Sequence, residues 1–510
     1  MILRVVLLTL VLLCRPAALA DVCRADAFSL LAGLPGAARF VLLVDDGALQ
    51  HRNPAGVSFE RAIGELGDFA GTAAAWREMA DVLELTPEAA FDALLGRRFV
   101  LVFADGKDGS GEWALLTEVT TSVERRLLRR LRPSPRQIKG GLPILAVENG
   151  RFELTSSPRG IVHQGAGGVA TLLMAPASAR GLFDSMLPLL SARRAEDALG
   201  ERVWFGKARE VGAGGVVVLW QGRNAPGEFV AASFSMVEGG WDGVIQASPS
   251  FLLPWVDAGR AGRASGLPAF AGLGNSVVAG MIGTSDRLTT LLLSMVEGGD
   301  ALMSIPPASS GAGVRSGVVV RAERGAARGR ARSSVTMFRE TGDPSRMIAY
   351  ADRVLSDQAQ RTGASPGRPG PTFRGLPGDV VRTVPAGETG RSLSWCVTAC
   401  DDASGWWIAE DAHVVPGGMH GPTWLRMFSD VLNASERGER PAALLSAGVL
   451  RPAGLIDVLA KDVRERTEEM EVLRAAQWVR EVTWLAQIGS EGVAQGAVGI
   501  RMRMPSPRGR

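Results

Sequence analysis

Histidine, a residue that often carries catalysis and metal binding, is scarce in this sequence. The 510 residues contain only His51, His163, His413 and His420. Any catalytic triad or histidine metal centre must therefore draw on these four. No serine stands on a Gly-x-Ser-x-Gly turn between a predicted strand and a predicted helix, where a hydrolase nucleophile is found. These shortages favour a non-enzymatic protein with no cofactor.

Cysteine is scarce as well. Cys14 lies in the N-terminal leader, which leaves Cys23, Cys396 and Cys400 for the rest of the chain. Three cysteines in a chain of this length cannot replace a hydrophobic core, which excludes a small fold held together by disulfides. An odd number also leaves at least one thiol without an intrachain partner, and the pairing stays open.

An excess of charge of one sign is missing too. The 56 basic and 53 acidic residues give a net charge of +3, so no field of the whole protein attracts nucleic acid. Beyond the first twenty residues, no apolar run reaches membrane-spanning length without a charge or repeated glycines. We therefore expect neither a nucleic-acid partner nor an integral membrane protein.

The N-terminus carries the pattern of an export signal. Arg4 precedes an apolar run, Val5–Leu13, and Ala18-Leu19-Ala20 supplies the small residues that signal peptidase requires. A spanning helix needs roughly 20 apolar residues, about twice the length of this run. We predict that residues 1–20 are a cleaved signal peptide, that the mature chain begins at Asp21, and that it is periplasmic or extracellular.

The remaining sequence has the composition of a globular protein, with 46% hydrophobic and 21% charged residues. Thr86, Pro87 and Gly96 mark the start and end of one helix, and Thr121 with Glu124 forms a capping box at the start of another. Further predicted helices are Ser178–Leu190, Phe251–Ala258, Ser285–Val296, Thr423–Leu432 and Leu455–Trp478. The predicted strands are Arg39–Val44, Phe99–Phe103, Trp113–Val119, Ile144–Val147, Phe152–Leu154, Val169–Met174, Val216–Trp220, Phe229–Phe234, Gly243–Ala247, Ser392–Thr398, Trp406–Ala409, Val479–Ala486 and Ala497–Met504.

This alternation predicts the α+β class, with repeated units of antiparallel sheet plus helix in two to three domains. We expect an N-terminal domain at 21–195, a middle domain at 196–361 and a C-terminal domain at 379–510. The linker between the last two is 362–378, which is rich in glycine, proline and arginine and has no apolar period.

One order of elements extends over much of residues 36–190. A helix start at Leu85–Glu88 is followed by the pair Leu95-Gly96, the apolar strand Phe99–Phe103 and the leucine-rich helix Val123–Leu131. This order resembles an uncharacterised family of exported bacterial proteins, known only as a domain of unknown function. The resemblance implies an exported α+β protein and implies no catalytic residues.

The most specific constellation is formed by Cys396, Cys400, His413 and His420, in the order C-x3-C-x12-H-x6-H. Two thiolates and two imidazoles are the ligands of a zinc finger. The last spacer is longer than in a zinc finger, and Pro416–Gly418 interrupts the helix on which the histidines would lie. We therefore predict no metal site, and these four residues are its only candidates. A Cys396–Cys400 disulfide would require the strand to bend.

One basic surface and one pair of adjacent carboxylates are further candidates. Arg125, Arg126, Arg129, Arg130 and Arg132 lie on the helix that starts at Thr121, and such a basic face suits either solvent or an anionic lipid or wall polymer. The adjacent Asp45 and Asp46 would point to opposite faces of a strand, which argues against a general acid and base pair.

We expect an exported, non-enzymatic envelope protein with a binding or structural role, whose partner is an unknown envelope protein or polymer. A secreted hydrolase is the alternative, with a site near Asp401, Asp402, His413 and His420. A carbohydrate-binding module is a third reading, in which Trp406 and Trp407 stack on sugar rings.

Overall fold

The structure is a computed structural model of the whole chain. The residues that it describes are 24–53, 55, 56, 58, 80, 81, 83–106, 111–131, 134–139, 142–147, 152–157, 168–191, 193–212, 214–222, 227–248, 262–264, 277–283, 286–296, 299, 302, 316–323, 332–341, 349, 353, 380–384, 391–399, 405–413, 442–459, 474–488 and 493–503. They form two compact units. Unit 1 is Met1–Phe251 with Ala497–Arg510, and unit 2 is Leu252–Gly496.

Unit 1 is built on an antiparallel sheet in which strands distant in sequence lie side by side. Its strands, in order across the sheet, are β4 (Ser134–Lys139), β5 (Leu142–Val147), β6 (Phe152–Ser157), β7 (Val169–Pro176), β3 (Gly111–Thr120), β2 (Phe99–Asp105), β1 (Ala38–Val44), β8 (Val216–Gln221), β9 (Phe229–Val237), β10 (Gly240–Ala247) and β20 (Ala494–Met502). Strand β1 is apolar from Phe40 to Val44, and Val41 pairs with Val102 on one side and Leu219 on the other.

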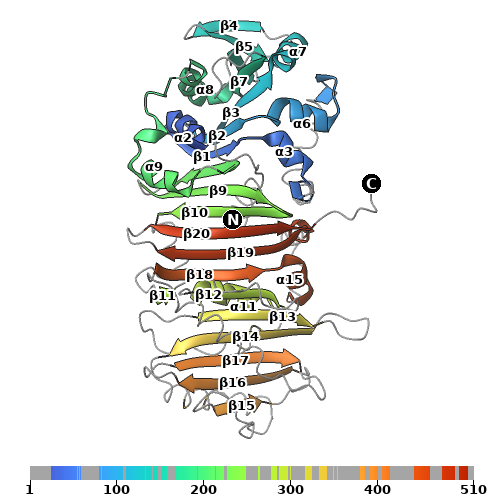
Figure 1. The fold of residues 1–510 in the computed structure, drawn as a ribbon, viewed down its shortest axis with the longest axis vertical. Coiled ribbons are helices and arrows are strands. Elements are labelled where there is room, and N and C mark those ends of the chain that lie inside the picture. The colour runs from blue at the N-terminus through green and yellow to red at the C-terminus, as the bar shows by residue number, and fades with distance from the viewer. Residues whose placement is uncertain are drawn as a thin grey trace. The chain divides into compact units, whose positions relative to one another are not determined.

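Helices cover both faces of the unit 1 sheet (Figure 1). On one side lie α3 (Gly47–Arg52), α6 (Pro87–Leu95) and α7 (Thr121–Leu131), and on the other lie α2 (Arg24–Gly33), α8 (Arg180–Met186) and α9 (Val203–Ala208). A sheet covered on both faces buries apolar residues at successive positions instead of alternating ones. This explains why Val41–Val44 are all buried.

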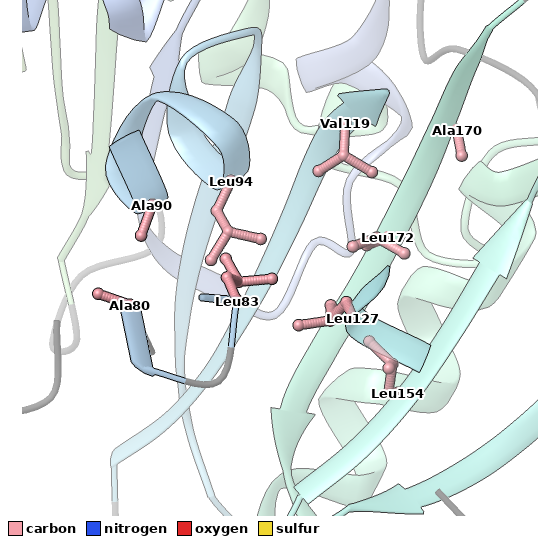
Figure 2. Close-up of a cluster of buried hydrophobic side chains, with 9 residues drawn as sticks. All are labelled: Ala80, Leu83, Ala90, Leu94, Val119, Leu127, Leu154, Ala170 and Leu172. Atoms are coloured by element: carbon pink, nitrogen blue, oxygen red, sulfur yellow. The ribbon is translucent and has the colours of Figure 1, made fainter. Parts of the chain in front are cut away.

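A hydrophobic cluster joins α6 and α7 to the sheet. Leu94 of α6 and Leu127 of α7 converge on Val119, Leu154 and Leu172 of the strands beneath (Figure 2). Leu127 is one of the residues expected on the buried stripe of its helix, and the other two, Val123 and Leu131, pack against the same cluster while remaining partly exposed. The cluster is the shared core of this face.

The predicted ends of α6 are confirmed. The Thr86 hydroxyl accepts a hydrogen bond from the Ala89 N–H at 3.3 Å, and Pro87 occupies the first helical turn. Gly96 ends the helix, and its N–H donates to the Asp92 carbonyl at 3.0 Å. A Cβ at Gly96 would lie against the Asp92 carbonyl oxygen, which explains the glycine.

The start of α7 differs from the predicted capping box by one residue. The helix begins at Thr121 as expected, but the hydroxyl that accepts a hydrogen bond from the Val123 N–H, at 3.3 Å, belongs to Thr120. Strand β3 ends at Thr120 and the helix follows at once. The strand end therefore supplies the cap that the sequence pattern assigned to Thr121.

Aromatic side chains hold α2 and α9 on the opposite face. Trp204 of α9 stacks on Phe229 of β9, with ring centroids 5.4 Å apart and an interplanar angle of 14°. Its neighbour Phe205 meets Phe28 of α2 edge to face at 6.2 Å. All four side chains are buried, so these rings fix both helices on the sheet.

Unit 2 is also an antiparallel sheet. Its strands, in order, are β15 (Val380–Val384), β16 (Arg391–Ala399), β17 (Gly405–His413), β14 (Arg332–Thr341), β13 (Ser316–Glu323), β12 (Val277–Gly283), β18 (Ala442–Leu450) and β19 (Val479–Ile488), and the short β11 (Gly262–Ala264) pairs with β18 beside β12. Two helices of this unit, α11 (Asp286–Met295) and α15 (Pro452–Val458), pack on the central strands. Figure 1 shows the ribbons of these strands lying side by side, with the chain direction alternating from one strand to the next.

The expected α+β class is wrong, because the described residues are mostly strand and both units are dominated by antiparallel sheet. The strand predictions were incomplete. The sheets also contain segments that the sequence did not mark as strands, namely β4, β11, β12, β13, β14, β15 and β18. The helix expected at Leu455–Trp478 also breaks early, since α15 ends at Val458 and Leu459 forms a β-bridge with Val296.

The expected domain division at 21–195, 196–361, 362–378 and 379–510 stays a prediction. The proposed linker, 362–378, lies outside the described residues, and so does the proposed signal peptide, 1–20.

Candidate functional site

Charged and hydroxyl side chains in the described part of unit 1 form a row across one end of its sheet. Asp45 follows β1 and Arg98 precedes β2, and the Arg98 Nε donates to Asp45 Oδ1 at 2.5 Å. The two side chains are 6% and 16% exposed. They therefore form a nearly buried ion pair between neighbouring strands.

Register extends this row over three more strands. The Glu118 N–H of β3 donates to the Arg98 carbonyl at 2.9 Å. Glu118 then pairs with Thr171 of β7, and Thr171 pairs with Ser157 of β6. Directly paired residues of an antiparallel sheet share a face, and all three are buried. We call Asp45, Arg98, Glu118, Thr171 and Ser157 the polar row.

The surroundings of the polar row indicate a structural role. Two residues along the strands, on the same face, lie Leu43, Val100, Leu116 and Leu173, which are all fully or almost fully buried. Removing two charges from water costs about as much free energy as their attraction in the protein interior supplies. Loss of one partner, in contrast, is strongly destabilising. A one-residue slip of any strand would move its polar residue away from the row. The row therefore specifies the register of these strands.

The two adjacent aspartates that suggested paired carboxylates have separate partners. Asp45 binds Arg98, whereas the Asp46 carboxylate accepts a hydrogen bond from the Leu49 N–H at 2.9 Å and caps the start of α3. The structure does not bring the two carboxyl groups together around a common point. Their positions explain both residues through folding.

Further ion pairs also join neighbouring strands. In unit 1, Arg39 Nε donates to Asp105 Oδ2 at 2.9 Å, and its Nη1 donates to the Gly222 carbonyl at 2.9 Å, so this guanidinium links β1 to strands on both sides. In unit 2, Arg451 Nε donates to Glu481 Oε2 at 2.8 Å. Charged side chains therefore fix strand ends in both units.

The four proposed metal ligands are only partly described. Cys396 lies on β16 opposite Ile408 of β17, whereas His413 lies opposite Arg391, five residues further along β17. At roughly 3.3 Å per residue the two positions are about 16 Å apart along the hairpin, too far for both to bind one ion. Cys400 and His420 lie outside the described residues. Within the described part of the chain, no three His, Cys, Asp or Glu side chains form a metal-binding group.

The residues proposed for the hydrolase and for carbohydrate binding fall in the same region. Asp401 and Asp402 lie outside the described residues. Trp406 and Trp407 are adjacent on β17, so they lie on opposite faces of the sheet. Trp395 pairs with Ala409, two residues from Trp407. By register, positions 395 and 407 are therefore diagonal neighbours on one face.

Comparison with protein-family models, with curated proteins and with solved structures gave no match for this chain. The resemblance to an exported family of unknown function stays a prediction. The site must therefore be interpreted from its own geometry. In the described part of the chain, no helix is long and apolar enough to cross a bilayer.

Sequence reasoning missed the polar row because its members come from five separate segments. Arg98 directly precedes the apolar run that begins at Phe99, and Glu118 lies near the end of another run, next to Val119. A charge at either point resembles an ordinary strand end. The signal that was available is the pair Arg97-Arg98 directly before a buried strand. Only the strand register shows that Arg98 is internal.

Proposed function

We propose that this chain is an exported, non-enzymatic envelope protein that acts as a scaffold for binding. The leader pattern at residues 1–20 supports export. The observation that carries the scaffold role is that ion pairs link strand to strand, as Asp45–Arg98, Arg39–Asp105 and Arg451–Glu481 do. Charges used in this way fix the strand register, so the exposed residues of each unit keep fixed positions toward a partner.

Export is tested by expressing the full chain in a Gram-negative host and fractionating the cells. We expect a periplasmic or secreted product whose N-terminus is Asp21 by mass spectrometry. The variant Ala18→Phe with Ala20→Phe should keep the leader, because signal peptidase accepts only small side chains at these positions. A full-length wild-type chain that stays in the cytoplasm would contradict the proposal.

The non-enzymatic role is tested separately on the purified mature chain. We test a panel of ester, phosphate, peptide and glycoside substrates with the wild-type chain and with His413→Ala. We expect no turnover that depends on His413. Turnover by the wild-type chain, lost in this variant while the circular dichroism spectrum is unchanged, would instead support the hydrolase alternative. His413 is the suitable probe because it is the histidine of that alternative on a described strand.

Carbohydrate binding is the second candidate, and the register of β16 and β17 favours it. By register, positions 395 and 407 share a face, and tryptophan is a residue type suited to stacking on sugars. If this role is correct, Trp395→Ala and Trp407→Ala should each weaken binding to a glycan array. The matched control Trp406→Ala, on the other face, should retain binding. Equal loss in all three variants would argue for a folding effect.

A further inference from the structure

Helix α7 presents a basic surface opposite the side that it buries. Leu127 inserts into the hydrophobic cluster shown in Figure 2. Arg125, Arg126, Arg129 and Arg130 are all exposed. The apolar side of the helix is thus occupied by the core, and the side that faces solvent is rich in guanidinium groups.

Two of these four arginines have partners within unit 1. Arg126 Nη1 donates to the Leu83 carbonyl at 3.3 Å, and Arg130 forms an ion pair with Glu84. Arg125 and Arg129 lie one helical turn apart. Among the described residues, neither forms an ion pair or a side-chain hydrogen bond. Their guanidinium groups are available to a partner.

An exposed aliphatic side chain lies on the same face of the sheet as α7. Ile138 of β4 is 80% exposed and pairs with Pro143 of β5. Pro143 shares a face with Leu145, which pairs with Leu154 in the cluster beneath α7. Figure 1 shows β4 and β5 next to α7 within unit 1. An isoleucine that exposed gains free energy when an apolar phase covers it.

We propose that Arg125, Arg126, Arg129, Arg130 and Ile138 form a docking surface for an anionic phospholipid bilayer. We call these five residues the α7–β4 surface. Bilayer phosphates match the planar guanidinium donors, and the acyl region accepts Ile138. A soluble anionic polymer would use the arginines but would give Ile138 no apolar partner. Because Leu127 belongs to the core, α7 binds peripherally and does not insert.

The inference rests on the proposed binding role in the envelope, and it predicts a weak, salt-sensitive interaction. Each basic side chain near an anionic leaflet strengthens binding by about five-fold, and the attraction falls as salt screens it. Replacing Arg125 and Arg129 by Gln should therefore lower the vesicle partition coefficient by about 30-fold. Ile138→Ser should lower it by about ten-fold.

The test is sedimentation of the purified mature chain with vesicles of phosphatidylcholine and phosphatidylglycerol at low and physiological salt. The variants are R125Q/R129Q and I138S. The matched control is R193Q/R194Q, which removes the same charge from two exposed arginines of the segment after α8. Circular dichroism and thermal melting of all variants should match the wild type, since every substituted side chain is on the surface.

The expected result is binding to anionic vesicles that the control retains and both test variants lose. Equal binding to pure phosphatidylcholine, or equal loss in the control, would overturn the proposed surface. Normal binding by I138S together with competition by soluble polyphosphate would assign the arginines to a polymer and would also overturn it. Vesicle binding is measured on purified protein. A chain that binds vesicles but is not exported would therefore contradict the proposed function and leave the surface standing.

Discussion

Each of the two units contains a strand glycine that lies beneath an aromatic ring of the neighbouring strand. In unit 1, Gly243 of β10 pairs with Phe234 of β9, and in unit 2, Gly448 of β18 pairs with Trp484 of β19. A Cβ on Gly243 would lie 2.5 Å from the phenyl ring. The glycine of each pair makes room for a ring that covers the strand, a device that pins register in antiparallel sheets.

The two rings differ in their surroundings. Phe234 is completely buried, whereas Trp484 is half-buried and its Nε1 donates to the Ser446 hydroxyl at 3.0 Å. Two of the ion pairs differ in the same direction, because Arg98 and Asp45 of unit 1 are 6% and 16% exposed and Arg451 and Glu481 of unit 2 are 19% and 28% exposed. The more exposed Arg39–Asp105 pair shows that the difference belongs to these individual contacts and not to every ion pair of unit 1.

The largest expected effect comes from the buried ion pair. Arg98→Met removes the partner of a carboxylate that water reaches poorly, and should destabilise unit 1 by about 3–5 kcal/mol. Arg451→Met in unit 2 leaves Glu481 more accessible to solvent, so we expect a smaller loss, of about 1–2 kcal/mol. Urea unfolding gives the total effect, and hydrogen exchange measured by mass spectrometry assigns it to a unit.

A double variant separates the pair from general damage. Asp45→Asn added to Arg98→Met removes the isolated charge, so part of the lost stability should return. If Arg98→Met and Arg451→Met cost the same, burial does not distinguish the units and the comparison fails.

The strands of unit 1 show how far the sequence reaches. The expected runs Arg39–Val44, Phe99–Phe103 and Trp113–Val119 are confirmed by β1, β2 and β3, since dense apolar runs bounded by polar turns identify buried strands. The ends of α6 could be predicted because Thr86 and Gly96 act within one turn of the helix. These features depend on local contacts.

The misses depend on contacts between distant segments. Strand β14 begins Arg332-Ser333-Ser334 and resembles a loop, yet Ser333 and Ser334 are buried because β13 and β17 flank the strand. Strand β18, with the sequence AALLSAGVL, has little intrinsic preference for extended structure and forms between β12 and β19. Arg98 became part of a candidate site for the same reason, since only the register places it beside Glu118.

The glycine pairs provide the next test of the comparison. Gly448→Ala should cost more than Gly243→Ala, although both should destabilise their unit by about 1–3 kcal/mol through overpacking. A Cβ at Gly448 meets the Gly280 carbonyl oxygen at 2.6 Å as well as the Trp484 ring, and a backbone atom cannot rotate away. At Gly243 the nearest atoms all belong to the Phe234 ring. Thermal unfolding with hydrogen exchange measures both, and the reverse order would contradict the argument that contact with the Gly280 carbonyl decides the cost.

The smallest expected effect concerns the polar end of Trp484. Trp484→Phe keeps a ring above Gly448 but removes the hydrogen bond to Ser446, a residue that is 5% exposed. The buried hydroxyl then lacks a donor, so we expect a loss of about 0.5–1.5 kcal/mol. Ser446→Ala alone and combined with Trp484→Phe completes a double-mutant cycle by urea unfolding. A coupling energy near zero would mean that the ring acts through packing alone, as Phe234 does in unit 1, and the difference between the two aromatic pairs would then be one of exposure and not of hydrogen bonding.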